Sequence, residues 1–211
     1  MMKSKVFLVR HAEPEGHHLR RFHGHFDPPL IEEGIRQSRA LKKRFQSEEV
    51  DLVFTSPLIR AKHTAELAFG DRKIPIIEDR SLIERNFGVL DGKPLEEVKR
   101  IHPNAEDIYE GRTRAKVPGV ESLTNVQRRA IRKLKELLDS NPGKNIVIVS
   151  HVMWTKSLLC KFLGLPISKM DDMGRVATAS ISVLEVQLYK NGRIRKIKVE
   201  TVGDRSHLVT K

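Results

Sequence analysis

Val6-Phe7-Leu8-Val9-Arg10-His11 is the stretch of sequence that decides the fold class. Its four apolar residues follow one another without alternating polar residues, as in a strand that is covered on both faces of a parallel sheet. Further strands of this kind are predicted at residues 51–55, 75–77 and 145–150. Helical patterns lie between them, at residues 35–45, 57–68 and 122–139. Strands that alternate with helices along the chain indicate an α/β fold with a parallel sheet.

The C-terminal part follows a different pattern. Residues 180–186 and 194–199 alternate apolar and polar side chains, and Lys190-Asn191-Gly192 lies between them. The Asn-Gly pair is a strong signal for a hairpin turn. We therefore expect an α/β fold of the three-layer α/β/α sandwich type, with a mostly parallel central sheet and a C-terminal antiparallel hairpin.

Length and composition favour a single domain over residues 1–211, with a small cap segment at about 93–121. The apolar runs are far shorter than the roughly 20 residues of a membrane span, and the first of them is too short for a signal peptide. Cys160 is the only cysteine, so no internal disulfide can form. We therefore expect a cytoplasmic protein with no membrane partner.

The chain carries 39 Lys and Arg against 27 Asp and Glu, which gives a formal net charge of +12. Two interpretations stay open, a heavily charged surface and a basic cleft that attracts anionic substrates. We expect no nucleic-acid partner, because aromatic residues make up only 5% and the basic residues are spread along the chain. A homodimer is left open.

Polar residues follow three of the predicted strands. They are Arg10-His11, Ser56-Pro57-Leu58-Ile59-Arg60 and Ser150-His151. In a parallel α/β sheet, ligands bind beyond the carboxyl ends of the strands, so these residues are expected to lie together at the opening of one binding site. Guanidinium groups hold phosphate and a neutral imidazole can attack phosphorus, which together favour phosphoryl transfer. Taken singly, each of these signals also fits a helix cap or a surface pair.

A phosphoryl transfer of this kind also needs an acid that protonates the leaving oxygen. Glu84, in Leu82-Ile83-Glu84-Arg85-Asn86-Phe87-Gly88, is a candidate on spacing, although a surface carboxylate fits its sequence context equally well.

Five spaced motifs occur in order along the chain. They are Arg10-His11-Ala12; Arg21, Gly24, Asp27-Pro28-Pro29-Leu30 and Gly34; Ser56-Pro57-Leu58-Ile59-Arg60-Ala61-Lys62-His63-Thr64; Glu84, Phe87, Gly88 and Gly92; and Ser150-His151. In this order they resemble the motifs of the histidine phosphatase superfamily, also called the phosphoglycerate mutase-like family. The resemblance covers nearly the whole chain, and it implies a phosphoglycerate mutase-like fold.

The resemblance also implies the catalytic residues and their roles. His11 would attack phosphorus and form a phosphohistidine, while Arg10, Arg60 and a cationic His151 would hold the phosphoryl oxygens. Glu84 would protonate the leaving oxygen and then deprotonate the water that releases phosphate. No metal and no cofactor are expected, because Arg and His supply the positive charge.

Some residues depart from the family pattern. Ala12 replaces the usual Gly, and His17 stands where many members have an Asn that contacts phosphate. Ile31 stands where a Thr commonly caps the following helix, at a cost of about 1 kcal/mol. Val152 follows His151 where Gly is common, and its backbone N–H can still face the phosphate.

The histidine-rich loop at residues 17–25 allows two interpretations. One is a metal site with His23, His25 and Asp27 as ligands, although no fixed carboxylate framework accompanies them. The other, which we favour, is a loop that contacts an anion. The predicted phosphate- or substrate-binding residues are His17, Arg21, His23, Gly24 and Val152.

The resulting hypothesis is a metal-independent phosphomonoesterase that acts on a small phosphorylated metabolite. A cofactor-dependent phosphoglycerate mutase is the alternative, but Phe87 replaces the mutase Tyr and Leu95 stands where its Lys is expected. A basic binding module without activity would require a broken site, whereas all five core residues are present. In the cap segment, residues 94–101 read as a short helix. Tyr109, Arg112 and Arg114 either contact the leaving group or lie in exposed loops.

Overall fold

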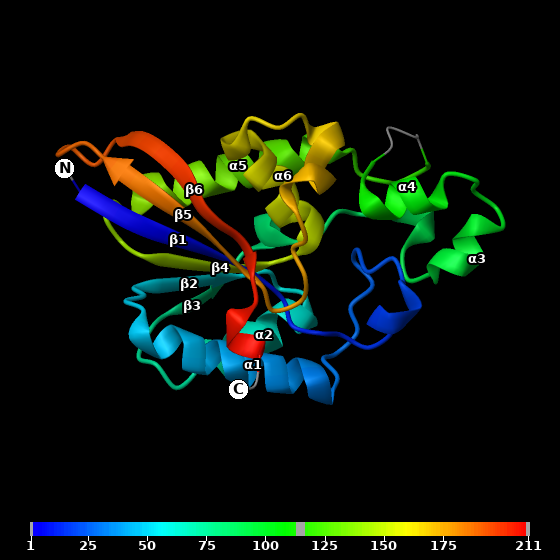
Figure 1. Ribbon diagram of the computed structural model, residues 1–211, viewed down its shortest axis with the longest axis horizontal. Coiled ribbons are helices and arrows are strands. Elements are labelled where there is room, and N and C mark those ends of the chain that lie inside the picture. Colours follow the sequence, from blue (N-terminus) through cyan, green and yellow to red (C-terminus); the bar gives the residue numbers. More distant parts are fainter. Residues whose placement is uncertain (1, 113–116, 210–211) are drawn as a thin grey trace.

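The computed structural model describes residues 2–112 and 117–209. Six strands form one sheet in the order β3-β2-β4-β1-β5-β6 (Figure 1). Their bounds are β1 (Met2–Arg10), β2 (Leu52–Thr55), β3 (Ile76–Glu78), β4 (Ile146–Ser150), β5 (Ile181–Leu188) and β6 (Ile194–Asp204). Strands β1 to β4 are mutually parallel, whereas β5 runs antiparallel to β1 and β6 antiparallel to β5. The predicted parallel sheet with its antiparallel C-terminal hairpin is therefore confirmed.

The described helices lie between the strands and after the last of them. The α-helices are α1 (Glu32–Arg44), α2 (Ile59–Phe69), α3 (Leu95–Lys99), α4 (Ala105–Glu110), α5 (Leu123–Ser140) and α6 (Val152–Leu163). The short 3₁₀ turns are η1 (His17–Leu19), η2 (Phe45–Ser47), η3 (Arg80–Leu82), η4 (Gly88–Leu90), η5 (Ile167–Met173) and η6 (Ser206–Leu208). None of the helices in residues 2–112 and 117–209 combines the length and the apolar character needed to cross a bilayer.

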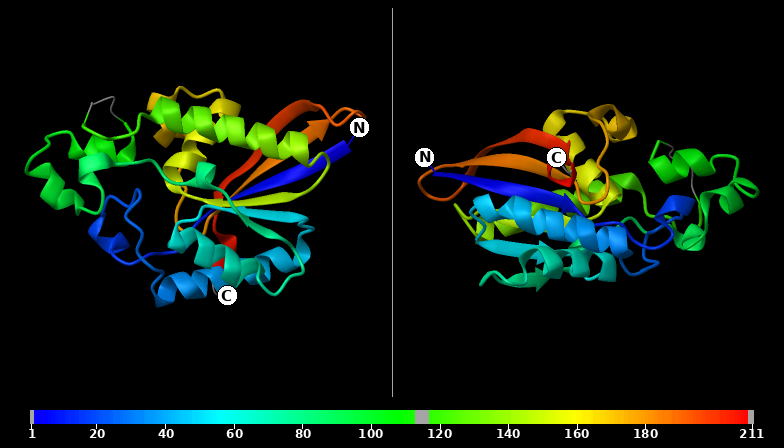
Figure 2. Two further views of the ribbon diagram at one scale, coloured as in Figure 1. Left: turned by 180° about the vertical axis from the view of Figure 1, so that it is seen from behind. Right: turned by 60° about the horizontal axis from the view of Figure 1, so that its bottom comes forward.

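Helices cover both faces of the sheet, as Figure 2 shows. Alternate residues of β1 point to opposite faces: Val6 and Leu8 pack with α5 and α6, whereas Phe7 and Val9 pack with α1 and α2. Both faces of β2 and β4 are buried, which explains their uninterrupted apolar sequences. The predicted three-layer α/β/α sandwich is confirmed.

Two helix starts differ from the sequence expectation. Helix α2 begins at Ile59, two residues after Pro57, and the Asp27 carboxylate accepts the Ile59 N–H at 2.7 Å. This cap comes from a distant loop, so periodicity within the helix gives no sign of it. Helix α1 begins at Glu32, three residues before the predicted start at Ile35, and Ile31 at the N-cap position leaves it without a side-chain cap, as its apolar side chain implies.

The described residues of the predicted cap segment, 93–112 and 117–121, contain α3 and α4, and these helices lie beyond the carboxyl ends of the parallel strands (Figure 1). Apolar residues of this segment, among them Leu95 and Ile108, pack in one cluster with Phe22 of the η1 loop and with Met153 and Cys160 of α6. The predicted helix at residues 94–101 is observed as α3. The six-residue α4 was not predicted, because so short a helix shows too few repeats of the helical period.

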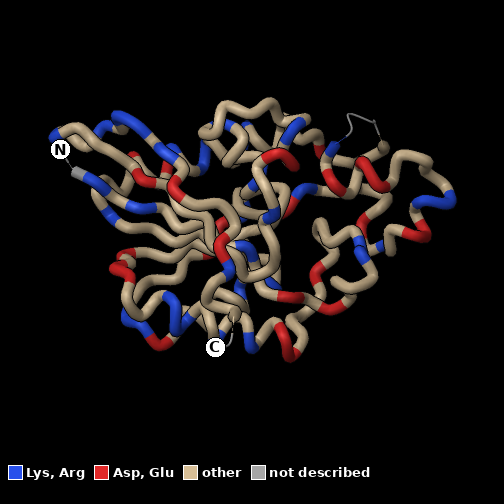
Figure 3. Tube along the Cα trace, viewed as in Figure 1, with Lys and Arg blue, Asp and Glu red and all other residues tan. Residues whose placement is uncertain are grey.

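Figure 3 shows that Lys and Arg are distributed over all parts of the chain in that view, with Asp and Glu interspersed. The net charge of +12 is therefore not concentrated in one element.

Candidate active site

The carboxyl ends of β1, β2 and β4 lie together at one end of the sheet, on the side of α3 and α4 (Figure 1). A cavity of about 430 Å³ opens there. Its lining residues come from the end of β1, the η1 loop, the segment between η3 and η4, the cap segment, the start of α6 and the loop before β5. They are Arg10, His11, His17, His18, Arg20, Arg21, His23, Glu84, Phe87, Tyr109, Glu110, Val152, Met153, Lys156, Arg175 and Val176. Seven of the ten predicted site residues line this cavity, and Gly24, Arg60 and His151 do not.

His11 lies at the buried end of the cavity, 3% exposed. Its Nδ1 lies 2.7 Å from the Ala12 carbonyl oxygen. A carbonyl only accepts hydrogen bonds, so Nδ1 carries the ring proton and Nε2 keeps a free lone pair. Burial lowers the pKa of His11 well below its usual value, and the neighbouring Arg60 and Arg10 guanidinium groups lower it further. The imidazole is therefore neutral and has the tautomer of a nucleophile.

Backbone hydrogen bonds fix the position of His11. Its N–H donates to the Ser150 carbonyl at 2.9 Å, and the Ala179 N–H donates to the His11 carbonyl at 3.1 Å. Ala179 has a φ of 54°, in the left-handed region that costs an alanine about 1–2 kcal/mol. The Ala12 N–H donates to Thr64 Oγ1 at 2.9 Å. Contacts from β4, α2 and the loop before β5 thus hold the residue in place.

His151 lies beside His11, with 5.1 Å between the ring centroids, and is fully buried. Its Nε2 lies 2.8 Å from Ser56 Oγ, and its Nδ1 has no partner among the described residues. Burial, followed by the charge of Arg60, lowers the pKa of His151 well below its usual value. Low dielectric and nearby cations therefore disfavour the imidazolium in the protein without substrate. The expected cationic His151 concerns the complex with a phosphoryl group and stays a prediction.

Arg60 is fully buried and does not line the cavity. Its Nη1 donates to the Phe26 carbonyl at 2.9 Å and to Asp27 Oδ1 at 3.2 Å, and its Nη2 donates to the carbonyls of His23 and Gly24 at 3.1 and 2.8 Å. Only Nε, which is buried and has no partner among the described residues, remains for a ligand. A two-pronged grip on phosphate by Arg60 is therefore excluded in this conformation.

Arg10 does line the cavity. One of its Nη groups donates to the Val176 carbonyl at 2.9 Å, and its buried Nε has no partner in the described chain. Burial lowers the pKa of Arg10 and lowers that of Arg60 to about 10, so both guanidinium groups keep their charge at neutral pH. The two arginines thus bring positive charge and free Nε–H donors close to His11, although Asp27 pairs with Arg60.

Glu84 is 2% exposed and faces the cavity. Its Oε1 accepts the backbone N–H groups of Arg85 at 2.8 Å and Trp154 at 3.3 Å, and its Oε2 accepts that of Met153 at 3.2 Å. Each carboxylate oxygen has two lone pairs, so Oε1 is saturated and Oε2 retains one position for a proton. The carboxyl group is therefore fixed, with a single oxygen available for proton transfer.

The start of α6 presents Val152 to the cavity. The first N–H groups of a helix have no partner within it. Glu84 accepts those of Met153 and Trp154, and the His151 carbonyl accepts that of Thr155 at 3.0 Å. The Val152 N–H is then the remaining donor of this turn, which agrees with its predicted place near the phosphate.

The η1 loop contributes three of the predicted binding residues, His17, Arg21 and His23, to the wall of the cavity. Burial and the charges of Arg10 and Arg175 lower the pKa of His17 to about 4. Burial and the charge of Arg60 lower the pKa of His23 to about 3. Both imidazoles are therefore neutral at physiological pH and contribute hydrogen bonds, not charge.

The alternative metal site with His23, His25 and Asp27 is not assembled. Within residues 2–112 and 117–209, no three His, Cys, Asp or Glu side chains gather in a way that could hold a metal ion. Asp27 instead caps α2 and contacts Arg60.

Gly24 has a structural position, in contrast to its predicted role in binding phosphate. Its N–H donates to Asp91 Oδ1 at 2.8 Å and its carbonyl accepts from Arg60. A Cβ atom at this position would lie 2.7 Å from the Arg85 carbonyl oxygen, so the close backbone approach explains the glycine. Because both backbone groups are engaged within the protein, neither faces a ligand.

Of the cap residues considered from sequence, Tyr109 lines the cavity. Arg112 is exposed and pairs with Asp107 at 3.1 Å and Asp171 at 3.6 Å. Arg114 lies outside the described residues.

The structure adds supporting residues that sequence reasoning missed. Arg129 donates to the carbonyls of Ser81, Ile83 and Glu84 at 3.0, 2.6 and 2.9 Å, and so positions the segment that carries Glu84. Arg129 lies on α5, whose amphipathic pattern gives no reason to single out one of its many basic residues. The roles of Asp91 and Ala179 likewise depend on contacts between distant segments.

Comparisons with known proteins identify the family of the chain. A family model for the histidine phosphatase superfamily (branch 1) matches residues 6–198. Phosphoserine phosphatase 1 of Hydrogenobacter thermophilus is 32% identical over 190 residues, covering 89% of this chain and 89% of that protein. A probable phosphoglycerate mutase, GpmB, of Yersinia pestis is 30% identical over 211 residues, covering 97% of this chain and 94% of that protein.

A solved structure gives the same result. YhfR of Bacillus stearothermophilus superposes with a TM-score of 0.88 at 28% identity, covering 98% of this chain and 100% of that one. The phosphoglycerate mutase-like fold implied by the motifs is thereby confirmed. With a family match over nearly its whole length, the chain belongs to the histidine phosphatase superfamily (branch 1) and is an enzyme of the phosphatase class.

Proposed function

We propose that the protein is a metal-independent phosphomonoesterase that hydrolyses a small phosphorylated metabolite through a phosphohistidine on His11. The state of the His11 imidazole carries this proposal. Its Nδ1–H is held by the Ala12 carbonyl, its Nε2 lone pair is free, and burial keeps the ring neutral beside two arginines. A neutral nucleophile next to fixed cations suits attack on an anionic phosphoryl group.

In the first step, His11 Nε2 attacks phosphorus and the bond from phosphorus to the ester oxygen breaks. The Nε–H groups of Arg10 and Arg60, His151 Nδ1 and the Val152 N–H are the donors available to the phosphoryl oxygens. A bound phosphoryl anion raises the pKa of His151 and thereby favours its imidazolium form in the complex. The acid form of Glu84 gives a proton from Oε2 to the leaving oxygen, and the alcohol departs.

In the second step, a water molecule attacks the phosphohistidine. The Glu84 carboxylate takes a proton from this water as its oxygen bonds to phosphorus, and the bond from phosphorus to Nε2 breaks. Inorganic phosphate leaves, His11 is neutral again and Glu84 is again an acid. The donors that hold the phosphoryl group are the same in both steps, so no part of the site has to reorganise between them.

A phosphoglycerate mutase is the second candidate, because the Yersinia pestis relative bears that name. A mutase would return the phosphoryl group to a second substrate instead of water. Leu95, which stands where the mutase pattern has a Lys, is 1% exposed and packs in the apolar cluster of the cap segment. It offers no charge to a phosphoglycerate, which favours hydrolysis.

The proposal is tested with p-nitrophenyl phosphate in the presence of EDTA. We expect the wild-type protein to release p-nitrophenol and His11→Ala to lose at least about a thousandfold in kcat. Denaturation in SDS at alkaline pH should trap a phosphoenzyme in the wild type and not in the variant, and this phosphoenzyme should be stable to base and labile to acid. The matched control is His25→Ala, which removes an exposed histidine that does not line the cavity.

Circular dichroism establishes that both variants are folded. Undiminished hydrolysis by folded His11→Ala contradicts the proposal. Formation of 2-phosphoglycerate from 3-phosphoglycerate with 2,3-bisphosphoglycerate, at a rate above hydrolysis, favours the mutase.

A further inference from the structure

The cavity carries more positive charge than the phosphoryl group requires. Five cationic side chains line it: Arg10, Arg20, Arg21, Lys156 and Arg175. Carboxylates neutralise two of them. Arg20 lies 2.5 Å from Glu106 and 2.7 Å from Glu110, and Lys156 lies 2.6 Å from Asp171. The other three have no acidic partner among the described residues.

These three cations differ in what they already bind. Arg10 adjoins His11 and belongs to the phosphoryl site. Arg21 donates through Nη1 to the Gly92 carbonyl, so part of its guanidinium is used inside the protein. Arg175 has neither a hydrogen bond nor an ion pair with the described chain, and its side chain is exposed at the cavity wall. Arg175 is thus the cation with all its donors available.

The backbone that carries Arg175 is nevertheless fixed. The Val176 carbonyl accepts from Arg10 at 2.9 Å, and the Val176 side chain is 2% exposed. On the other side, Gly203 of β6 approaches so closely that a Cβ atom there would lie 2.1 Å from the Arg175 carbonyl oxygen. The fold therefore holds this segment against the cavity and leaves only the Arg175 side chain free to move.

We propose that Arg175 binds a second anionic group, a carboxylate or a second phosphate, on the leaving-group part of the substrate. The inference rests on the proposed function and adds the substrate class, small phosphomonoesters with a further negative charge. The volume of about 430 Å³ suits a small metabolite. A guanidinium group binds carboxylate and phosphate through paired N–H donors, so both chemistries fit.

The test compares substrates that differ only in this group. O-phosphoserine and O-phosphoethanolamine differ by one carboxylate. We expect the wild type to prefer phosphoserine. In Arg175→Gln, the ratio of the two kcat/KM values should fall about tenfold, mainly through a higher KM for phosphoserine, because ground-state binding is lost. Comparing the kcat/KM values of fructose 1,6-bisphosphate and fructose 6-phosphate tests in the same way whether a second phosphate is bound.

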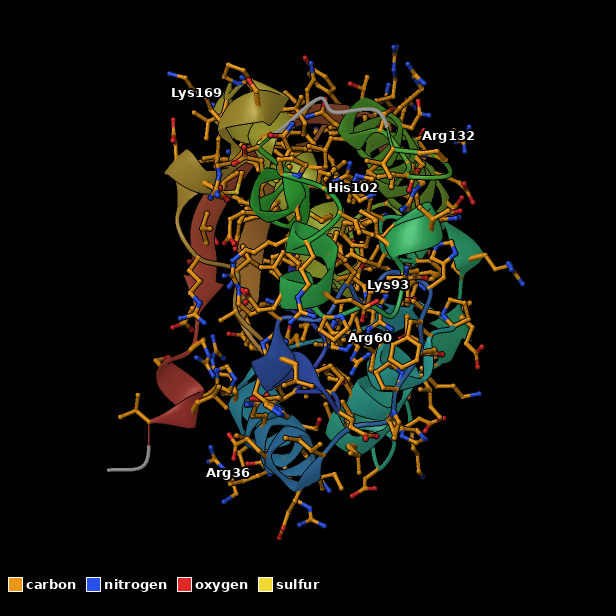
Figure 4. All side chains as sticks on the ribbon, turned by 90° about the vertical axis from the view of Figure 1, so that its right-hand side faces the viewer. Arg36, Arg60, Lys93, His102, Arg132 and Lys169 are labelled. Atoms are coloured by element: carbon orange, nitrogen blue, oxygen red, sulfur yellow. The ribbon has the colours of Figure 1, made fainter. Side chains whose placement is uncertain are left out.

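Lys169→Gln is the matched control, because it removes one positive charge at the periphery, away from the cavity (Figure 4). It should leave both ratios as in the wild type. An unchanged ratio of the kcat/KM values in Arg175→Gln overturns the inference. An equal fall of this ratio in Lys169→Gln also overturns it, since the fall would then reflect the overall positive charge of the protein and not a contact with Arg175.

The inference also falls if the wild type hydrolyses p-nitrophenyl phosphate but prefers neither doubly anionic substrate over its partner. The proposed function stands in that case. The proposed function itself fails if p-nitrophenyl phosphate hydrolysis does not depend on His11, or if mutase activity exceeds hydrolysis.

Discussion

Thr64 connects two motifs that lie far apart in the sequence. Its hydroxyl accepts the Ala12 N–H at 2.9 Å and donates to the Arg60 carbonyl at 2.7 Å, and the side chain is fully buried. One hydroxyl therefore satisfies the backbone beside the nucleophile and ties it to the helix that carries Arg60. The motif in the sequence contains Thr64, but its spacing does not say what the hydroxyl bonds.

Thr64→Val should be destabilising although it keeps the shape of the side chain. The buried Ala12 N–H then has no acceptor, which costs about 1–3 kcal/mol. We expect the urea midpoint to fall accordingly and kcat to fall with it, since Ala12 also accepts from His11. Thr64→Ser keeps the hydroxyl and serves as the control. Equal midpoints for the two variants would show that the hydrogen bond contributes nothing.

At the residue scale, the sequence predicts which side chains gather at the strand ends but not which of their atoms are free. The order of the motifs brings His11, Glu84 and Arg10 to one cavity, where the structure places them. Arg60 lies near the site, but its two Nη groups donate four hydrogen bonds to the loop at residues 23–27. The direction of loop carbonyls depends on tertiary packing, so no sequence pattern reveals it.

At the scale of elements, the loop at residues 23–27 is held from two sides. Arg60 donates to its carbonyls, as described above. Asp91, just after η4, accepts the N–H groups of Gly24, His25 and Phe26, each at 2.8 Å. A carboxylate and a guanidinium thus fix the two polar edges of one loop, and this loop carries His23 into the cavity wall.

Asp91→Ala should release this loop. Three backbone donors lose a charged acceptor, two of them in exposed residues that water can satisfy, so we expect a loss of about 2–4 kcal/mol in unfolding free energy. We also expect kcat/KM for p-nitrophenyl phosphate to fall by at least about tenfold, because the loop positions Arg60 and His23. The exposed Asp172→Ala is the control and should change neither. Wild-type activity in folded Asp91→Ala would rule out a positioning role for the loop.

The elements themselves differ in how well the sequence predicts them. Strands β2 and β4 are short, apolar and buried on both faces, so composition alone identifies them. The Asn191-Gly192 turn also appears as expected, with the Gly192 φ at 81°. Helices α4 and η1 are too short to show a repeat of apolar residues with the helical period. The start of α2 depends on a hydrogen bond to the distant Asp27.

At the scale of the whole molecule, the sheet brings cations and histidines into one buried region. Burial lowers the pKa values of His11 and His151 well below the usual one, and those of His17 and His23 to about 4 and about 3. All four histidines are neutral in the folded protein at pH 6, whereas in the unfolded chain they titrate near 6.5. The site therefore couples protonation to folding.

This coupling fixes the sign of the pH dependence of stability. Below about pH 6.5 the unfolded chain binds protons that the folded protein does not, so the free energy of unfolding falls as the pH falls. We expect the urea midpoint to decrease steadily from pH 7 to pH 5, a window that lies above the usual carboxylate pKa values. His17→Gln/His23→Gln should show a shallower decrease, and exposed His25→Gln should keep the wild-type slope. The buffers must be free of phosphate, since a bound anion stabilises the folded state by mass action. A wild-type midpoint that is constant or rises between pH 7 and pH 5 would mean that these histidines are protonated in the folded protein, and the neutral nucleophile would then have no support.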